Sequence, residues 1–238
     1  MRGPSSAPIT PLTGSFFHAG TQTAFATRFA SRHDSTMARA RPPGSPTVLL
    51  VRPTIETLPR YVAALAQGWS PDNVRGKAAA DEELERVAQD QAAFIAGLDD
   101  PDGDGPPVTL PDGSEVPRLP GFRRWVWDGD FCGSIGFRWR PGASSLPAYV
   151  LGHVGYAIVP WKQGNGYATQ ALALLLPEAR RRGLTHIDLT TDPDNVASQR
   201  VILNNGGVLI ERFQKPPMYG GGQGLRFRIS LTPQRCGR

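Results

Sequence analysis

The stretch that decides the fold runs from Gly152 to Phe213 and reads GHVGYAIVPWKQGNGYATQALALLLPEARRRGLTHIDLTTDPDNVASQRVILNNGGVLIERF. Its hydrophobic pattern predicts a strand, a glycine-rich turn, a helix, a second strand, a short helix and a third strand. We expect the first strand over 153–159 and the helix over 166–182, with Gly183 at the helix C-terminus. Pro177 is unfavourable inside that helix, but the apolar residues at helical spacing around it still favour a helix.

The glycine-rich turn, residues 163–168, is the part of this stretch that predicts chemistry. A glycine turn that leads into a helix exposes several backbone N–H groups at the positive end of the helix dipole, which is a cradle for a phosphate or pyrophosphate. A Rossmann fingerprint would require glycine where Thr169 stands, and the lysine of a P-loop is absent. Both of those nucleotide-binding motifs are therefore excluded.

Outside this stretch, size and composition indicate one compact domain. The chain has 238 residues, 39% hydrophobic and 20% charged, with no apolar run of about 18 residues that could span a bilayer. The two cysteines, Cys132 and Cys236, cannot make a disulfide framework or a close metal pair. The net charge of +5 comes mostly from residues 1–46, which hold five arginines and one aspartate. A basic tail on a nearly neutral body is weak support for nucleic-acid binding.

The remaining segments follow in an order that suits one α/β domain. Residues 1–46 are rich in Ser, Thr, Ala, Pro and Gly and are predicted to be disordered. The segments expected after them are a buried strand over 47–52, helices over 54–64 and 78–98 with Thr54 as a cap, an acidic Pro/Gly connector over 99–120, a hairpin around Asp128-Gly129-Asp130, and a last strand over 226–231.

The stretch from Gly152 to Phe213 resembles the acyl-CoA signature of the GCN5-related N-acetyltransferases, the GNAT family. The first motif of that family is Gln or Arg, two residues, Gly, one residue, then Gly or Ala, and it is matched by Gln163, Gly166 and Ala168. The second motif is matched by Asn195, Ser198, and the pair Asn205-Gly206 at the end of the short helix. Two motifs about thirty residues apart, with the right elements between them, are more specific than either alone.

The resemblance implies acetyl-CoA as co-substrate, bound between splayed strands at 153–159 and 185–191. The pantetheine would pair with the backbone of Ile158 and Val159, and backbone N–H groups near Ile158 would stabilise the oxyanion while an amine attacks the thioester. The cofactor-binding residues implied are Ile158, Val159, Gln163, Gly164, Asn165, Gly166, Tyr167, Ala168, Thr169, Asn195 and Ser198.

The catalytic acid and base are not given by the family pattern, because the first strand has no glutamate and Ile202 stands where many members have a tyrosine. His153 is the titratable base of that strand, and its ordinary pKa suits proton removal. The competing interpretation is a structural histidine at a strand start. Tyr156 and Tyr219 are the candidate acids, with bulk water as the alternative.

The fold class predicted is therefore α/β and GNAT-like, a mixed, mostly antiparallel twisted sheet flanked by helices. The domain is expected over 47–233, after the extension 1–46 and before a tail at 234–238. We expect a cytoplasmic N-acetyltransferase that acts on the primary amine of a small molecule in a ternary complex, without metal, nucleic acid or membrane, as a monomer or homodimer. The alternatives are acetylation of a protein N-terminus or lysine, and a non-catalytic acyl-CoA-binding regulatory module.

Overall fold

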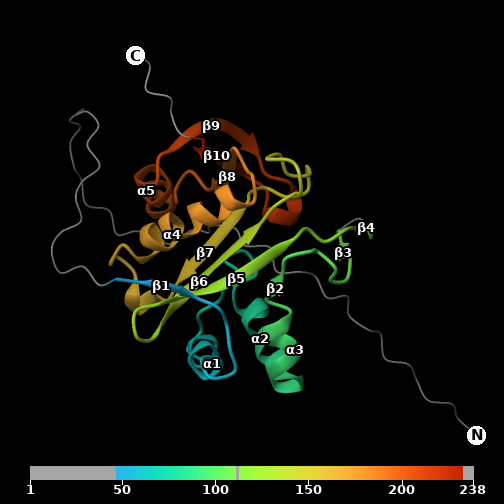
Figure 1. The fold of residues 1–238 in the computed structure, drawn as a ribbon, viewed down its shortest axis with the longest axis vertical. Helices are drawn as coiled ribbons and strands as arrows, with labels where there is room; N and C mark the ends of the chain where they lie inside the picture. Colours follow the sequence, from blue (N-terminus) through green and yellow to red (C-terminus); the bar gives the residue numbers. More distant parts are fainter. Residues whose placement is uncertain (1–46, 111–112, 233–238) are drawn as a thin grey trace, which may run out of the picture.

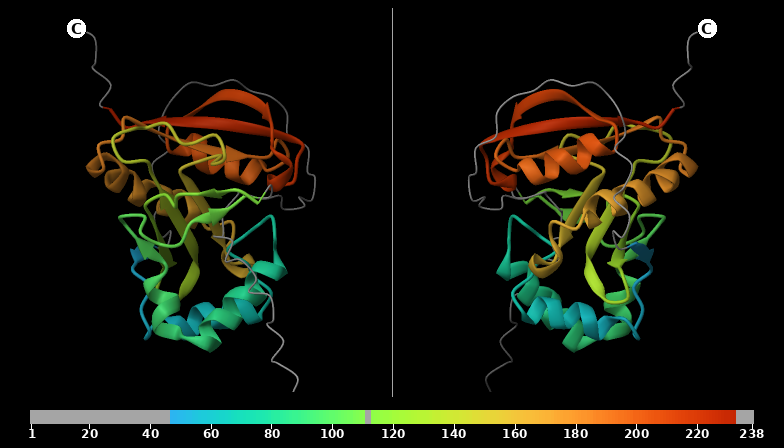
Figure 2. Two further views of the ribbon diagram at one scale, coloured as in Figure 1. Left: turned by 90° about the vertical axis from the view of Figure 1, so that its right-hand side faces the viewer. Right: turned by 90° about the vertical axis from the view of Figure 1, so that its left-hand side faces the viewer.

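The computed structural model describes residues 47–110 and 113–232. The expectations for residues 1–46 and for the C-terminal tail lie outside the described residues. In Figure 1 strands β5, β6 and β7 cross the centre of the molecule, with α1, α2 and α3 on one side and α4 and α5 on the other. Figure 2 shows the same order from the side, with a second, smaller sheet farthest from α1–α3.

The first sheet is antiparallel throughout. Its strand order is β1-β5-β6-β7, and β2 also pairs with β5. The bounds are β1 Leu49–Val51, β2 Asp99–Asp100, β5 Gly121–Trp127, β6 Phe131–Arg138 and β7 Val154–Ile158. The turn between β5 and β6 contains Gly129 at φ 114°, which is the hairpin predicted around Asp128-Gly129-Asp130.

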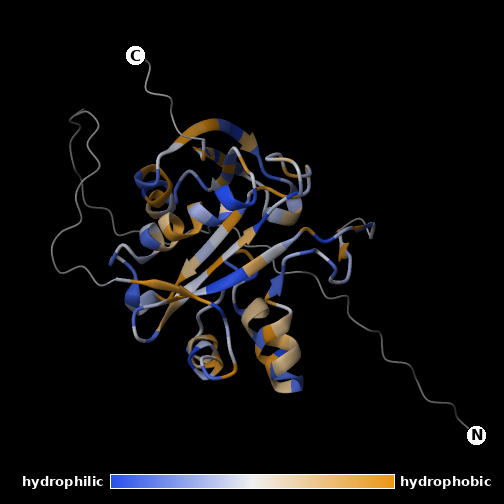
Figure 3. Cartoon of the chain, in the orientation of Figure 1, coloured by the Kyte–Doolittle hydropathy of each residue, from blue (hydrophilic) through white to orange (hydrophobic). Residues whose placement is uncertain are grey.

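The second sheet contains β8, β10 and β9 in that order, again antiparallel. Its bounds are β8 His186–Thr191, β9 Gly207–Gln214 and β10 Gln223–Ser230. A short 3-10 helix, η2 Pro217–Tyr219, lies between β9 and β10. β9 is the outer strand, and its exposed apolar residues Val208, Leu209 and Ile210 give the first half of the strand its hydrophobic colour in Figure 3.

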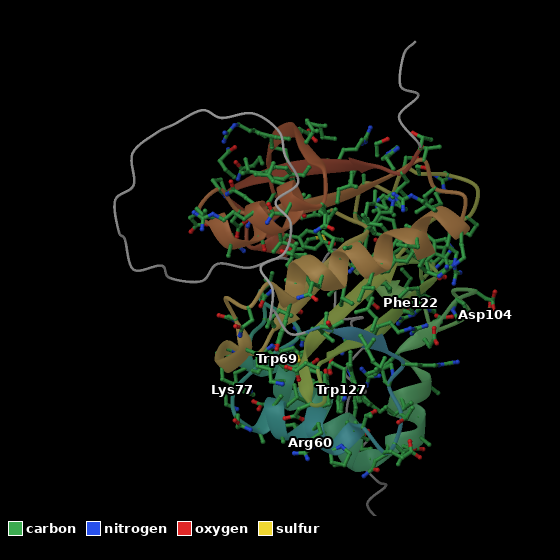
Figure 4. All side chains as sticks on the ribbon, turned by 60° about the vertical axis from the view of Figure 1, so that its left-hand side comes forward. Arg60, Trp69, Lys77, Asp104, Phe122 and Trp127 are labelled. Atoms are coloured by element: carbon green, nitrogen blue, oxygen red, sulfur yellow. The ribbon has the colours of Figure 1, made fainter. Side chains whose placement is uncertain are left out.

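Helices cover both faces of the first sheet. On one face lie α1 Leu58–Ala66, α2 Lys77–Gln89 and α3 Gln91–Ala96, and on the other lies α4 Tyr167–Arg181, next to α5 Val196–Asn204. Apolar side chains separate accordingly into two clusters. Trp69 and Trp127 pack on the α1 side and Phe122 on the α4 side (Figure 4). No helix within the described ranges combines the length and apolar character needed to cross a membrane.

Alternation along β7 fixes which side chains point to which layer. Val154 and Tyr156 belong to the cluster on the α4 side, whereas Ala157 and Val159 belong to the cluster on the α1 side. Successive strand residues point to opposite faces. His153 and Gly155 therefore face the α1 side as well.

The structure corrects two of the expected helices. The helix expected from Thr54 starts at Leu58 with Pro59 in its first turn, because proline is favoured there and disfavours helical backbone at the residues before it. The helix expected over 78–98 is interrupted at Asp90, which is extended and whose side chain accepts from the Ala93 N–H as the cap of α3. At that position the hydrogen bond of a capping side chain ends one helix and starts the next, although the apolar residues continue at helical spacing.

The acidic connector over 99–120 is more regular than expected. It contains β2 and a small two-stranded sheet of β3 Val108–Thr109 and β4 Glu115–Val116. Asp100 accepts hydrogen bonds from the backbone N–H groups of Gly103, Asp104 and Gly105. Asp100 thus organises a turn of this segment.

Candidate functional site

β7 and β8 meet at one point and belong to different sheets. At that point the His153 N–H donates to the Asp188 carbonyl over 2.8 Å, and the Asp188 N–H donates to His153 Nδ1 over 2.9 Å. In a continuous parallel ladder the second bond would go to a backbone carbonyl, whereas here the imidazole nitrogen accepts it. A Cβ on Gly152 would lie 3.1 Å from the Asp188 carbonyl oxygen, so the glycine allows this close approach. The parting of the two strands that the GNAT resemblance implies is therefore present.

His153 is fully buried at this junction, with 0% of its surface exposed. Burial disfavours the charged ring and lowers its pKa to about 4. Because Nδ1 accepts a hydrogen bond, the neutral ring carries its proton on Nε2. Nε2 is itself buried without a hydrogen-bond partner.

The glycine turn lies beyond the end of β7. A 3-10 turn, η1 Pro160–Lys162, separates it from the strand, and α4 begins at Tyr167. Gly164 and Gly166 have φ of 79° and 74°, a conformation in which other residues are strained. Among the residues that the structure describes, no side chain caps the N-terminus of α4. Its first amides are therefore available to an anion at the positive end of a helix dipole.

Asp128, in the turn between β5 and β6, bonds residues at both ends of the glycine loop. Asp128 accepts from Lys162 Nζ over 2.7 Å and from the Tyr167 hydroxyl over 2.6 Å, and these two residues flank residues 163–166. Hydrogen bonds from Lys162 and Tyr167 lower the pKa of Asp128 despite its burial. Lys162 Nζ also lies 3.5 Å from Cys132 Sγ, and burial together with Asp128 raises the pKa of that thiol to about 12, which keeps it protonated and unreactive.

Side-chain amides hold the rest of the first motif. Gln163 Nε2 donates to the Ile158 carbonyl over 3.0 Å, which joins the turn to the end of β7. Asn165 Nδ2 donates to the Lys162 carbonyl over 3.1 Å. The side-chain amides of Gln163 and Asn165 thus shape the turn that leads into α4.

The second motif lies against the first. Asn195 caps α5 by accepting from the Ser198 N–H over 3.0 Å, and both residues are buried. At the other end of α5, Asn205 Nδ2 donates to the Thr169 carbonyl in the first turn of α4, over 3.2 Å. The two motifs, separated in sequence, are joined by this bond.

The two candidate tyrosines lie in different places. Tyr156 is buried on β7 and its hydroxyl donates to the Ser198 carbonyl over 3.4 Å, so it reaches the second motif. Tyr219, in η2, donates to the Tyr149 carbonyl over 2.7 Å instead. Burial raises the pKa of both phenols.

Sequence reasoning missed Asp128 and Lys162 as residues of the site. The only signal was the D-G-D turn, which predicts a hairpin, and its proximity to the glycine loop depends on the pairing of β5, β6 and β7. In the parts of the chain that the structure describes, no group of three or more His, Cys, Asp or Glu side chains could hold a metal ion.

Comparisons with known proteins agree with this geometry. Residues 108–208 match the family model described as an acetyltransferase (GNAT) domain. No curated protein matches the sequence.

Three solved structures are similar in fold. RimL, a ribosomal L7/L12 alpha-N-protein acetyltransferase in complex with coenzyme A, has a TM-score of 0.52 at 15% identity, covering 79% of this chain and 96% of its own. The microcin C7 self-immunity acetyltransferase MccE, in complex with acetyl-CoA and AMP, has 0.51 at 12%, covering 77% and 92%. A GNAT-family acetyltransferase from Bacillus anthracis has 0.50 at 15%, covering 77% and 95%. At these identities the likeness shows the fold.

The burial of His153 predicts a pH-dependent stability. Its pKa is about 4 in the folded chain, against 6.5 for the free side chain, so between these values the unfolded chain binds a proton that the folded chain does not. The buried neutral ring of His153 therefore contributes most to the free energy of unfolding above pH 6.5. As the pH falls below that value this contribution decreases, and at pH 4 it is smaller by about 3 kcal/mol. His153→Asn removes it. Urea unfolding of both proteins from pH 7 to pH 4 should therefore show their stability difference shrink by that amount, and parallel curves would contradict the buried neutral state.

Proposed function

We propose that this chain, whose residues 108–208 match the acetyltransferase (GNAT) domain, acetylates the primary amine of a small molecule by direct attack within a ternary complex. In this proposal the chain is an N-acetyltransferase and acetyl-CoA is its co-substrate, as the match to the acetyltransferase (GNAT) domain supports. The observation that carries the proposal is the uncapped start of α4, with Gly164 and Gly166 at positive φ, placed where β7 leaves its neighbour β8.

The anion site at α4 suits the pyrophosphate of the co-substrate. The backbone N–H groups of residues 164–168 supply donors, and the helix dipole supplies positive potential. Asp128 itself is negative, but Lys162 and Tyr167 hold its carboxylate. Its contribution is to fix the two ends of the loop, so that the amides need not be ordered when the anion binds.

The backbone of β7 offers the pantetheine a row of hydrogen-bonding groups. In an antiparallel pair, alternate residues bond the neighbouring strand. The Val159 N–H donates to the Cys132 carbonyl, and the Arg138 N–H donates to the His153 carbonyl. Val154, Tyr156 and Ile158 therefore direct their backbone groups to the gap beside β8. Val159, implied by the family resemblance, has its amide engaged with β6 and its carbonyl with Lys162, so we place the contacts at Tyr156 and Ile158.

The alternation of backbone groups along β7 also supports an oxyanion site at the Ile158 N–H. The Ile158 N–H lies on the gap side of β7, whereas its carbonyl already accepts from Gln163. A fixed N–H donor at this point would stabilise the negative charge that develops on the thioester oxygen as the amine attacks.

The proton of the acceptor ammonium is taken by solvent in our proposal. His153 has no free lone pair in this structure, because Nδ1 accepts from Asp188 and Nε2 carries the proton. We therefore assign His153 to the junction of the two strands. The candidate acid is Tyr156, because its hydroxyl contacts α5 at Ser198, where the second motif approaches the gap.

The glycine loop gives a test of co-substrate binding. Gly166→Val places a branched side chain on the anion side of the loop and strains a backbone at φ 74°. The dissociation constant of acetyl-CoA, measured by calorimetry, should rise by about a hundredfold, as expected for losing charge-assisted hydrogen bonds to a phosphate. Gly142→Val is the matched control, because Gly142 has φ 72° and open space around it but lies in another loop. Equal affinities of the two variants would remove the assignment.

The two tyrosines give a test of the acid. Tyr156→Phe should lower turnover by about 10² if its proton goes to the departing thiolate, and it should leave the affinity for acetyl-CoA nearly unchanged. Tyr219→Phe serves as the comparison, because it removes a buried phenol that bonds a loop carbonyl elsewhere. A Tyr156→Phe enzyme with parental turnover would assign the proton to bulk water.

The function itself is tested by thiol release from acetyl-CoA across a panel of small primary amines, lysine peptides and peptide N-termini. Acetylation of small amines is expected, with an acidic limb of the pH–rate profile that follows the acceptor ammonium and persists in His153→Asn. Turnover on peptides alone would replace the small-molecule acceptor with a protein. Tight acetyl-CoA binding without turnover on any amine would indicate a regulatory module.

A further inference from the structure

β9 carries an apolar strip at the edge of the second sheet. It is the last strand in the order β8-β10-β9, and no other strand of the described ranges pairs with its outer side. Val208, Leu209 and Ile210 follow one another in it and are 64%, 39% and 45% exposed. Figure 3 shows this half of β9 in the hydrophobic colour. An edge of unpaired backbone groups with exposed apolar side chains is a surface that pairs with another strand.

The neighbouring helix α5 extends this apolar surface. Leu203 is 53% exposed, and its carbonyl accepts from the Gly206 N–H in the turn that leads into β9. Val196 is 48% exposed and stands seven residues before Leu203, so the two side chains lie on one side of the helix. A stable dimer buries about 800 Å² from each partner, which is more than one strand edge supplies. The exposed side of α5, which packs against β9, adds to that area.

A β-bulge limits how far another strand can follow β9. The register between β9 and β10 shifts after Leu209, and Ile210 has no opposite residue on β10. A bulge bends its strand and interrupts regular pairing, and natural edge strands use it to avoid open-ended aggregation. The three residues of the strip carry no charge, and charged side chains begin at Glu211 and Arg212. The strip therefore suits a short and specific pairing.

The strip is complementary to a copy of itself. In an antiparallel pair with a two-fold axis at Leu209, the two Leu209 residues stand opposite each other, and Val208 stands opposite Ile210 of the second copy. Every apolar residue then meets an apolar residue. An axis at Ile210 would instead place Leu209 opposite Glu211. An axis at Glu211 would place two carboxylates opposite each other, which is destabilising. Charge and apolar character thus select one register.

The charges beside the strip do not oppose this pairing. Glu211 forms an ion pair with Arg226 of its own sheet, with 3.0 Å between Oε2 and Nε. With the axis at Leu209, Glu211 faces Gly207 of the second copy and Arg212 faces Gly206. These glycines leave room for both side chains, so no like charges stand opposite each other in the pair.

We infer that two copies of this chain form a homodimer in which the β9 strands pair across a two-fold axis at Leu209. The second sheets of the two copies then join in the order β8-β10-β9-β9-β10-β8, and Leu203 of each copy packs beside the new pair. The contact uses the same edge of both copies, so it closes at two chains. It involves only the outer edge of β9 and the exposed side of α5, so it does not rest on the proposed acetyl transfer.

The mass of the full chain in solution, measured by sedimentation velocity over a range of concentrations, tests the dimer. We expect the mass of two chains. Ile210→Lys places a charge in the strip, which blocks strand pairing, and should raise the dissociation constant of the dimer about a hundredfold, because each dimer carries the change twice. Leu49→Lys is the matched control, because Leu49 is 59% exposed on β1, the edge strand of the first sheet. Circular dichroism checks that both variants fold. A monomer at every concentration, or a dimer that Ile210→Lys leaves intact, would overturn the inference.

Cross-linking tests the register, and it keeps the test decisive if Ile210→Lys fails to fold. Opposite residues of an antiparallel pair have Cα atoms about 4.5 to 5.5 Å apart, within reach of a disulfide. Leu209→Cys, made in a chain with Cys236→Ser, should therefore form a linked dimer on mild oxidation. Leu203→Cys in the same background is the comparison, because Leu203 is at least as exposed but lies off the axis. Equal cross-linking of the two variants, or none of either, would overturn the pairing of β9. Masses above two chains would overturn the two-fold closure.

Discussion

The junction between His153 and Asp188 is the contact on which the rest of the site depends. A backbone ladder between parallel strands continues until something replaces one of its partners. Here the imidazole Nδ1 accepts the bond of the Asp188 N–H, and beyond it β7 and β8 belong to separate sheets. The exchange costs little in hydrogen bonding, because the Asp188 amide remains satisfied. It requires a neutral ring, and burial keeps the pKa of His153 low enough to maintain one.

Beyond the point where β7 leaves β8, the backbone groups and the side chains of β7 have different roles. Backbone groups of alternate residues bond β6, the intervening backbone groups face the gap, and the side chains divide between the two helical layers. Tyr156 illustrates the coupling: its backbone lies at the gap, and its side chain crosses to α5 and meets Ser198. A substitution in this strand therefore affects strand pairing and the packing of both helical layers together.

The sequence predicted the fold and the glycine turn that leads into α4 because both are encoded in contiguous residues. The glycines at 164 and 166 and the uncapped start of α4 appear as a short motif, and the second motif follows at a fixed distance. The break at Asp90 was not predicted, because a cap within a helical pattern competes with periodicity on nearly equal terms. The Asp128 contact with Lys162 and Tyr167 spans more than thirty residues, and its existence depends on strand register, which no local pattern specifies.

The grouping of side chains across the first sheet was the least predictable part for the same physical reason. The positions of the backbone N–H groups at the start of α4 follow from a turn and a helix end, both of which are local. Which side chains of β5, β6 and β7 share a face is decided by strand pairing. Moving β6 by one residue relative to its neighbours would turn Ser134 and Arg138 to the opposite face. A register of this kind joins residues far apart in the chain, so no short motif specifies it.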